Sequence, residues 1–175
     1  MASGDVLQKY AASSALTWTL ASLASDTSLI AGRCSSTVDN TGTPYQDYHV
    51  GGKITVGTTP TTATTIEIWA VAISNDTPLW PTSSVGVFGS GDAAVTVYSR
   101  GSLFGYGRLL VSLQVDSATS NRPYEFSGLS IAAAYGGRVP EKFCLWAVHN
   151  TAVNLNSTGG NHVVSVTPVY SFVTP

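Results

Sequence analysis

Apolar and polar residues alternate in short segments along this chain, and the alternation predicts β-strands rather than helices. Residues 64–74 and 142–149 are apolar on both alternating faces, which is typical of interior strands covered on both sides. The other segments carry one apolar face or a softer alternation. Strands are also expected at residues 16–20, 45–56, 94–98, 103–115, 124–134 and 162–173. Few segments offer three apolar turns at helical spacing, so low helix content is expected.

Glycine, proline and polar clusters separate these segments. Residues 57–65 are expected to form an exposed hairpin tip, and residues 150–160 a turn that joins the last two strands as a hairpin. Gly51-Gly52 predicts a β-bulge or bend inside its strand. Pro168 cannot donate a ladder hydrogen bond, so it is expected at a bulge or on an edge. The expected irregular or bent segments are residues 25–43, 75–91 and, as a glycine-bent β segment, 101–108.

About eight strands without β-α-β alternation predict an all-β fold, an antiparallel β-sandwich. A jelly roll with two Greek keys is the first expectation and an immunoglobulin-like sandwich the second. Residues 15–175 are expected to form this single domain, preceded by an extended N-terminal arm, residues 1–14. The arm has only Val6, Leu7 and Tyr10 as sizeable apolar groups. It is expected as an arm or as one short turn of helix around residues 6–12. We expect it to be mobile until it docks on a partner; the alternatives are a tether with no partner and a strand of the domain's own sheet.

The charged fraction is 10%, against about 25% in ordinary globular domains. A surface of this kind suits a protein packed against other proteins, and we expect a dimer or trimer; the abundance of threonine also fits a β-rich chain with no such role. The net charge of −2 argues against a nucleic-acid partner. No apolar segment reaches the roughly 20 residues that a membrane span needs, and no signal-peptide pattern begins the chain, so synthesis in a cytosol is expected.

The two cysteines, Cys34 and Cys144, lack the spacing of a zinc site. Cys144 lies in an apolar strand and is expected to be a buried free thiol, with a bridge to Cys34 as the alternative. The acidic residues are scattered singly, which argues against a calcium site. No metal and no other cofactor is therefore expected.

Chemistry-bearing residues are few. His149 and His162 flank the last turn and are interpreted as structural. Glu67 and Glu125 are carboxylates within strands, and a glycosidase would need such a pair about 5 Å apart. Trp80, in a proline-rich loop, is the one tryptophan considered for a surface binding role, because the other three alternate with apolar neighbours inside strands. The residues indicate no enzyme.

Several runs of the sequence resemble a family of small structural proteins encoded beside the major capsid protein of tailed bacteriophages. The resemblance covers about a third of the chain and consists of packing and turn residues. Its segments are residues 11–25 (AASSALTWTLASLAS), residues 131–143 (IAAAYGGRVPEKF), Asn150-Thr151 and residues 157–162 (STGGNH).

The resemblance implies a virion component made in the cytoplasm of the host bacterium. It would be a jelly-roll decoration or cement protein on the outer surface of the phage head, bound to the major capsid protein and to copies of itself. In this interpretation Val6, Leu7 and Tyr10 of the arm contact the capsid. The alternatives are a tail- or fibre-associated structural protein and a carbohydrate- or receptor-binding jelly roll that uses Trp80.

Overall fold

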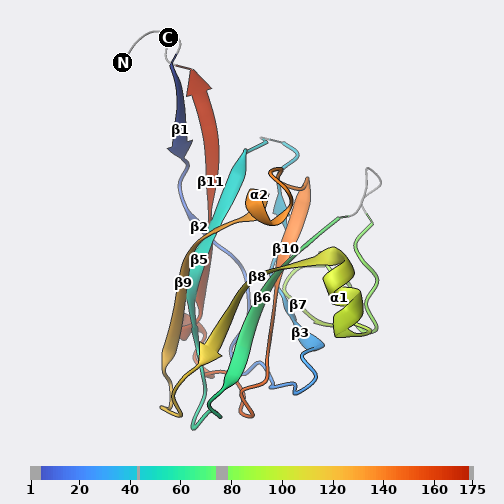
Figure 1. Ribbon diagram of the computed structural model, residues 1–175, viewed down its shortest axis with the longest axis vertical. Helices are drawn as coiled ribbons and strands as arrows, with labels where there is room; N and C mark the ends of the chain where they lie inside the picture. Colours follow the sequence, from blue (N-terminus) through green and yellow to red (C-terminus); the bar gives the residue numbers. More distant parts are fainter. Residues whose placement is uncertain (1–4, 43, 74–78, 174–175) are drawn as a thin grey trace.

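The computed structural model describes residues 5–42, 44–73 and 79–173 and folds them into two antiparallel sheets packed face to face (Figure 1). The first sheet has the strand order β1-β11-β5-β9, with β2 also paired to β11, and the second has the order β7-β3-β10-β6-β8, with β4 paired to β10. The all-β sandwich is thereby confirmed. The strands of the first sheet are β1 (Val6–Tyr10), β2 (Ser14–Ala15), β5 (Asp47–Thr55), β9 (Pro123–Ser130) and β11 (Val163–Val173). Those of the second are β3 (Ala31–Cys34), β4 (Val38–Asp39), β6 (Thr64–Ala72), β7 (Ala93–Thr96), β8 (Gly107–Val115) and β10 (Lys142–His149).

The strand pairs are nested in the sequence, so that an early strand pairs with a late one and the innermost pair lies near the middle of the chain. The pairs are β2 with β11, β3 with β10, β5 with β9, and β6 with β8. The two hairpins expected at residues 57–65 and 150–160 are therefore wrong. These segments join β5 to β6 and β10 to β11, and each pair of strands lies in different sheets. The physical reason is that β6 and β10 are apolar on both faces, so they pair with each other inside the second sheet, and the first sheet covers one of their faces.

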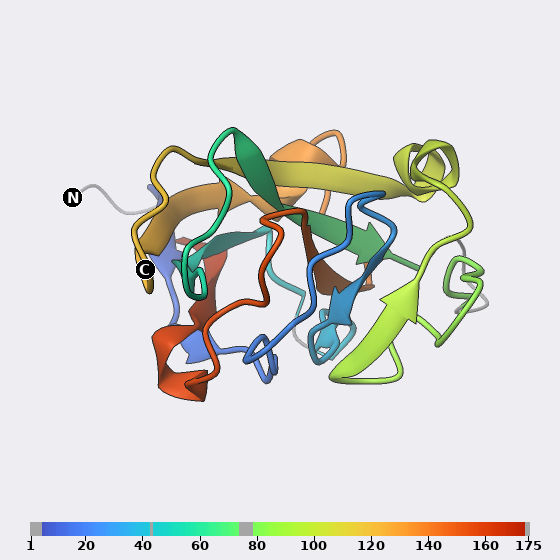
Figure 2. The same ribbon diagram turned by 90° about the horizontal axis from the view of Figure 1, so that it is seen from below.

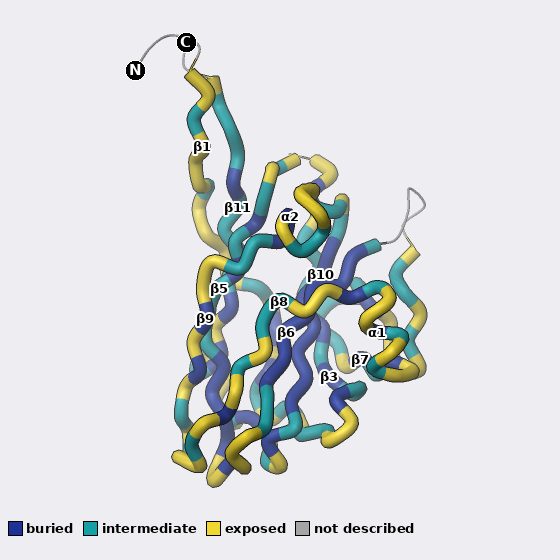
Figure 3. The backbone as a smooth tube through the Cα atoms, in the orientation of Figure 1, coloured by how far each residue is buried: buried dark blue, intermediate teal, exposed yellow. Residues whose placement is uncertain are grey.

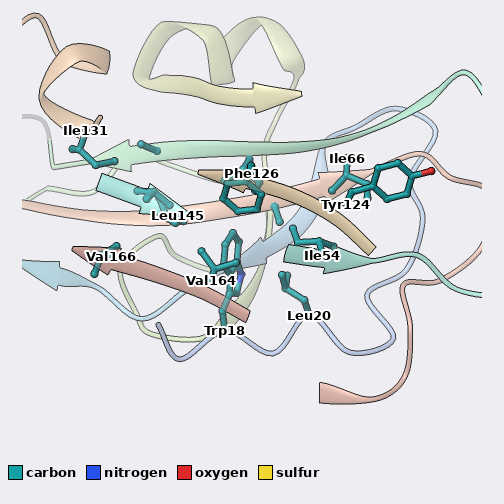
Figure 4. Close-up of a cluster of buried hydrophobic side chains, with 14 of the residues drawn as sticks. Trp18, Leu20, Ile54, Ile66, Tyr124, Phe126, Ile131, Leu145, Val164 and Val166 are labelled. Atoms are coloured by element: carbon teal, nitrogen blue, oxygen red, sulfur yellow. The ribbon is translucent and has the colours of Figure 1, made fainter. Parts of the chain in front are cut away.

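An inner core fills the space between the two sheets (Figure 4). Ile66 of β6 and Leu145 of β10 enter it from the second sheet, and Phe126 of β9 and Val166 of β11 from the first. Trp18 also packs there, as expected for a tryptophan that alternates with apolar neighbours. Burying each such side chain stabilises the fold by roughly 1.5–3 kcal/mol.

An outer core lies on the opposite face of the second sheet, where Trp69, Trp146 and Cys144 are completely buried. It is covered by residues 79–106, which include helix α1 (Arg100–Tyr106) and gather on one side of the sandwich (Figure 2). These two cores confirm the prediction of cover on both sides for β6 and β10; residue 74 of the predicted segment 64–74 lies outside the described residues. The two cysteine sulfurs approach to 3.2 Å, and both thiols are free and buried. Burial raises the pKa of the Cys144 thiol well above its usual value.

Five segments differ from the sequence expectation. Residues 16–20 bury Trp18 and Leu20 in alternation but form no strand beyond Ala15. Residues 25–43 contain β3 and β4, which are too short to show a pattern. Residues 100–106 form α1 rather than a bent strand, because Ser99 caps the helix by accepting a hydrogen bond from the Ser102 N–H. Residues 131–134 form helix α2 (Ile131–Ala134), and residues 159–161 a short 3₁₀ turn, η1 (Gly159–Asn161).

The bulge expected at Gly51-Gly52 is present, as a register shift between β5 and β9 after Val50. Gly52 is required there, since a Cβ atom would lie 2.1 Å from the Val163 carbonyl oxygen. Pro168 lies inside β11, opposite the gap between β1 and β2. Its carbonyl accepts from the Ala11 N–H, so its nitrogen faces the same gap, where no strand requires a donor.

Candidate partner-binding surface

Strand β1 and the end of β11 form a two-stranded ribbon that projects beyond the sandwich (Figure 1). We call this pair, Val6–Tyr10 with residues 169–173, the ribbon. Strand β5 pairs with β11 only as far as Asp47 opposite Val169, so the last four residues of β11 have β1 as their one described neighbour in the sheet. An isolated pair of strands is only marginally stable in water, so this geometry favours a partner that covers the ribbon.

The ribbon corrects the picture of the N-terminal arm. Residues 1–4 of the arm lie outside the described part of the chain; residues 6–10 are extended, as expected, and form a strand of the first sheet rather than an unpaired segment. This is the alternative in which the arm belongs to the domain's own sheet. It still contributes nothing to either core, because β1 lies beyond the end of the second sheet (Figure 3).

The three arm residues expected to contact a partner do not share one face. Val6 and Tyr10 lie on one side of the ribbon, where they are 68% and 62% exposed, and Leu7 lies on the other, half-buried. The apolar side chains on each side of the ribbon continue from β1 onto β11, and the apolar residues of β11 were not predicted to belong to this surface. Val173 pairs with Val6 and is 61% exposed, whereas Phe172 pairs with Leu7. Pro168 predicted a bulge or an edge for this strand, whereas β11 lies between β1 and β5 in the first sheet.

The long edge of β1 is open. Ala11 donates its N–H to the Pro168 carbonyl, which fixes the alternation of the ladder. Residues 7 and 9 then direct their backbone groups toward β11, and Val6, Gln8 and Tyr10 direct their N–H and C=O groups away from it. No described residue pairs with those outward groups. The edge is therefore able to accept a further strand.

A hollow of about 440 Å³ lies where the ribbon leaves the sandwich, lined by Ala11, Pro44, Tyr45 and Tyr170. The rings of Tyr45 and Tyr170 meet edge to face with centroids 6.3 Å apart. Aromatic side chains beside a concave surface are typical of protein interfaces. The hollow extends the candidate surface from the ribbon onto the body of the domain.

The structure keeps the two candidate glycosidase carboxylates apart. Glu67 points to the outer face of the second sheet and Glu125 to the outer face of the first, so the whole sandwich separates them. Glu67 is buried and receives two hydrogen bonds from Arg100, at 2.8 and 3.0 Å, and one from the Trp69 indole at 3.0 Å. It fastens α1 to the sheet, and no two-carboxylate site exists at these residues.

The two candidate histidines are held by hydrogen bonds inside the fold. His149 is completely buried; its Nε2 lies 3.0 Å from the Leu23 carbonyl oxygen and its Nδ1 3.0 Å from Thr151 Oγ1. Burial lowers the pKa of His149 to about 4. His162 lies 2.8 Å from the Asn156 carbonyl oxygen, and burial lowers its pKa too. Both are neutral at pH 7, as structural histidines are.

The indole of Trp80 is half-buried and lies directly on Gly89, where a Cβ atom would come within 1.9 Å of the ring. It packs against the outer core from the covering segment. A shallow hollow of about 490 Å³ on the first sheet, beside Gly52 and Glu125, contains no aromatic platform that faces outward. The structure therefore does not bring Trp80 together with a second stacking ring.

Among the described residues, no three histidine, cysteine or acidic side chains gather as a metal site would require. The helices of the same part of the chain are all too short to cross a bilayer. Comparisons with protein-family models, curated proteins and solved structures find no match. Within the described part of the chain, the projecting ribbon with the hollow at its base is the strongest candidate for a partner-binding surface.

Proposed function

We propose that this protein is a non-catalytic structural component of a phage virion, a decoration or cement protein on the outer surface of the head. Its partners would be the major capsid protein and copies of itself, as a dimer or trimer, and it would be made in the host cytoplasm. The observation that carries the proposal is the ribbon, which exposes apolar side chains on two strands outside the sandwich. The resemblance of residues 11–25 and 131–143 to the phage structural family supports the major capsid protein as the partner.

The ribbon has the properties of a docking element. Val6, Tyr10 and Val173 are each more than 60% exposed, and full burial of such side chains stabilises a complex by roughly 1.5–3 kcal/mol apiece. Ordering and association costs reduce that gain, so one ribbon would bind weakly. Many copies on one lattice would multiply the effect. Binding restricted to the expanded head would then stabilise only the mature lattice.

The strand order supports the jelly-roll form of the sandwich. Nested pairing of β2 with β11, β3 with β10, β5 with β9, and β6 with β8 is what a long hairpin rolled into two sheets produces. In this interpretation β1 extends the first strand, and residues 79–106 are an insertion that covers the second sheet. Jelly rolls occur in viral capsid domains, so the architecture agrees with the proposed role.

The test is binding to purified expanded heads. The double variant Val6→Ser with Tyr10→Ser removes two exposed apolar side chains from the ribbon. The matched control is Val85→Ser with Tyr98→Ser, which removes the same two residue types, 61% and 65% exposed, from the segment that covers the outer core. We expect the ribbon variant to stay folded and to bind heads at least tenfold more weakly, with the control unchanged. Equal binding by the two variants would refute docking through the ribbon.

Copy number in purified virions tests the position of the protein. Mass spectrometry should find it in hundreds of copies if it decorates the head. A few copies that purify with tails would instead assign it to the tail or fibre, and binding to a host polysaccharide would favour the receptor-binding alternative.

A further inference from the structure

The outer edge of β1 lacks the features that protect the other sheet edges. Strand β9 begins at Pro123 and is bent at Gly128, and β7 has its outer side bonded to Ser84 and Val85. Strand β8 carries a bulge opposite Ile68. In contrast, β1 is five residues long without proline, glycine or bulge. Proteins block exposed edges with these devices unless the edge is used for pairing.

The one charged residue of β1 does not protect the edge either. Lys9 Nζ lies 4.0 Å from the centroid of the Phe172 ring, in a cation–π contact with the neighbouring strand of the same ribbon. Its backbone groups belong to the set that faces β11. The outward groups are those of Val6, Gln8 and Tyr10, whose side chains are uncharged.

We propose that β1 pairs edge to edge with β1 of a second copy, antiparallel about a twofold axis through Gln8. The proposal builds on the self-association suggested above and not on binding to the head. About this axis Val6 lies opposite Tyr10, Leu7 opposite Lys9, and Gln8 opposite Gln8. Every outward N–H and C=O of Val6, Gln8 and Tyr10 then finds a partner, because these three positions become the hydrogen-bonded pairs of the new ladder.

The sequence of β1 is complementary to itself only in this direction. The antiparallel arrangement joins β-branched to aromatic side chains, a favourable cross-strand pair, and lays the stem of each lysine along a leucine. In-register parallel pairing would instead bring the two Lys9 ammonium groups together. The exposed stripe of Val173 and Val6 would continue through Tyr10 of the partner copy. Two marginal two-stranded ribbons thereby become one four-stranded sheet that links the two sandwiches.

Two proline variants at one residue pair of the ribbon distinguish the outer edge of β1 from the opposite edge, that of β11. Gln8 of β1 is paired with Ser171 of β11, and both direct their N–H groups away from the ribbon. The N–H of Gln8 points outward from the free edge of β1. The N–H of Ser171 points to the opposite edge of the ribbon, where β5 no longer pairs with β11. Proline at either position removes one outward donor and leaves the bonds between β1 and β11 intact. Gln8→Pro should block the proposed pairing, and Ser171→Pro is the matched control.

Sedimentation velocity over a range of concentrations gives the oligomeric state, with circular dichroism to show that each variant is folded. We expect the original chain and Ser171→Pro to form dimers and Gln8→Pro to raise the dimer dissociation constant at least tenfold. A monomeric original chain, or a Gln8→Pro dimer of unchanged affinity, would overturn the proposal. Equal loss in both variants would also overturn it, since the β1 edge would then have no special role.

Cross-linking gives a second measurement that does not require the proline variants to fold. Gln8→Cys places two thiols at the twofold axis, while the native cysteines stay buried. A short bismaleimide should join this variant into covalent dimers and should leave Ala118→Cys, exposed in the loop between β8 and β9, monomeric. Failure of Gln8→Cys to cross-link in a dimeric sample would contradict the axis. Val6 and Tyr10 also form the proposed cross-strand pairs, so the oligomeric state of the head-binding variant has to be measured as well. Head binding by Gln8→Pro, which keeps both side chains, then shows whether either proposal fails without the other.

Discussion

Replacing His149 by glutamine should remove much of the dependence of stability on pH between pH 7.5 and 4.5. The imidazole is completely buried, and burial lowers its pKa to about 4 from the ordinary value of 6.5. In the unfolded chain the same group takes up a proton near pH 6.5. Acidification through this window therefore stabilises the unfolded state, while the folded state stays unprotonated until about pH 4. Stability is fully present above pH 6.5 and is lost as the pH falls.

The size of the effect follows from the two pKa values. With 6.5 in the unfolded state and about 4 in the folded state, the free energy of unfolding falls by about 2.5 kcal/mol between pH 7.5 and 4.5. His162, whose pKa burial also lowers, acts in the same direction. The carboxylates with lowered pKa values, Asp26, Asp39 and Asp92, start from 3.8 and titrate mainly below this window.

Urea unfolding at closely spaced pH values gives the measurement. The free energy for the original chain should fall by about 2.5 kcal/mol or more across the window, and the fall for His149→Gln should be smaller by about 2.5 kcal/mol, whatever its stability at pH 7.5. His162→Gln is the control, and it should keep the part of the slope that belongs to His149. A flat profile for the original chain, or an unchanged slope in His149→Gln, would refute the assignment of a buried neutral imidazole.

Three further predictions concern the second sheet. Gly32→Ala should destabilise the protein by about 1–3 kcal/mol in thermal or urea unfolding, because a Cβ would lie 2.2 Å from the Ala147 carbonyl oxygen; Gly105→Ala in α1, with nothing within 4 Å, should be neutral or stabilising. Arg100→Ala should cost about 3–5 kcal/mol because it leaves the buried Glu67 carboxylate without its cationic partner and with only the Trp69 indole, of the described groups, donating to it. Arg122→Ala, in an exposed ion pair, should cost about 0–1 kcal/mol; similar losses would contradict the argument. The two buried cysteines should resist iodoacetamide in the native state and react after denaturation, as mass spectrometry would show; rapid native labelling would contradict their burial.

The sequence predicts the interior strands well because their chemistry is local. Residues 142–149 are apolar on both faces, and β10 has the predicted bounds, with Leu145 in the inner core and Trp146 in the outer core. The glycine pair at residues 51–52 likewise predicts its bulge from backbone geometry alone. Such features depend on burial periodicity and sterics, which a single segment carries by itself.

Strand partners and the candidate site could not be derived in this way. The last two strands look like a hairpin, yet β10 and β11 lie in different sheets, and nothing in residues 150–160 distinguishes a tight turn from a crossing between sheets. The ribbon was only half predicted. Val6, Leu7 and Tyr10 are recognisable as apolar groups in a polar arm, but they pair with residues 169–173, and nothing in the arm itself indicates so distant a partner strand.

The nested pairing also determines when the ribbon can form during synthesis. Val6 is synthesised long before Val173, so β1 cannot pair with β11 until β11 has emerged from the ribosome. Pairings between such distant residues are intrinsically slow, because a long loop has to be closed before any contact compensates for it. A nascent or truncated chain therefore displays neither the completed ribbon nor its open edge. Assembly through that edge would therefore select subunits in which β1 has already paired with β11, because only these have the ordered edge that joins a neighbour.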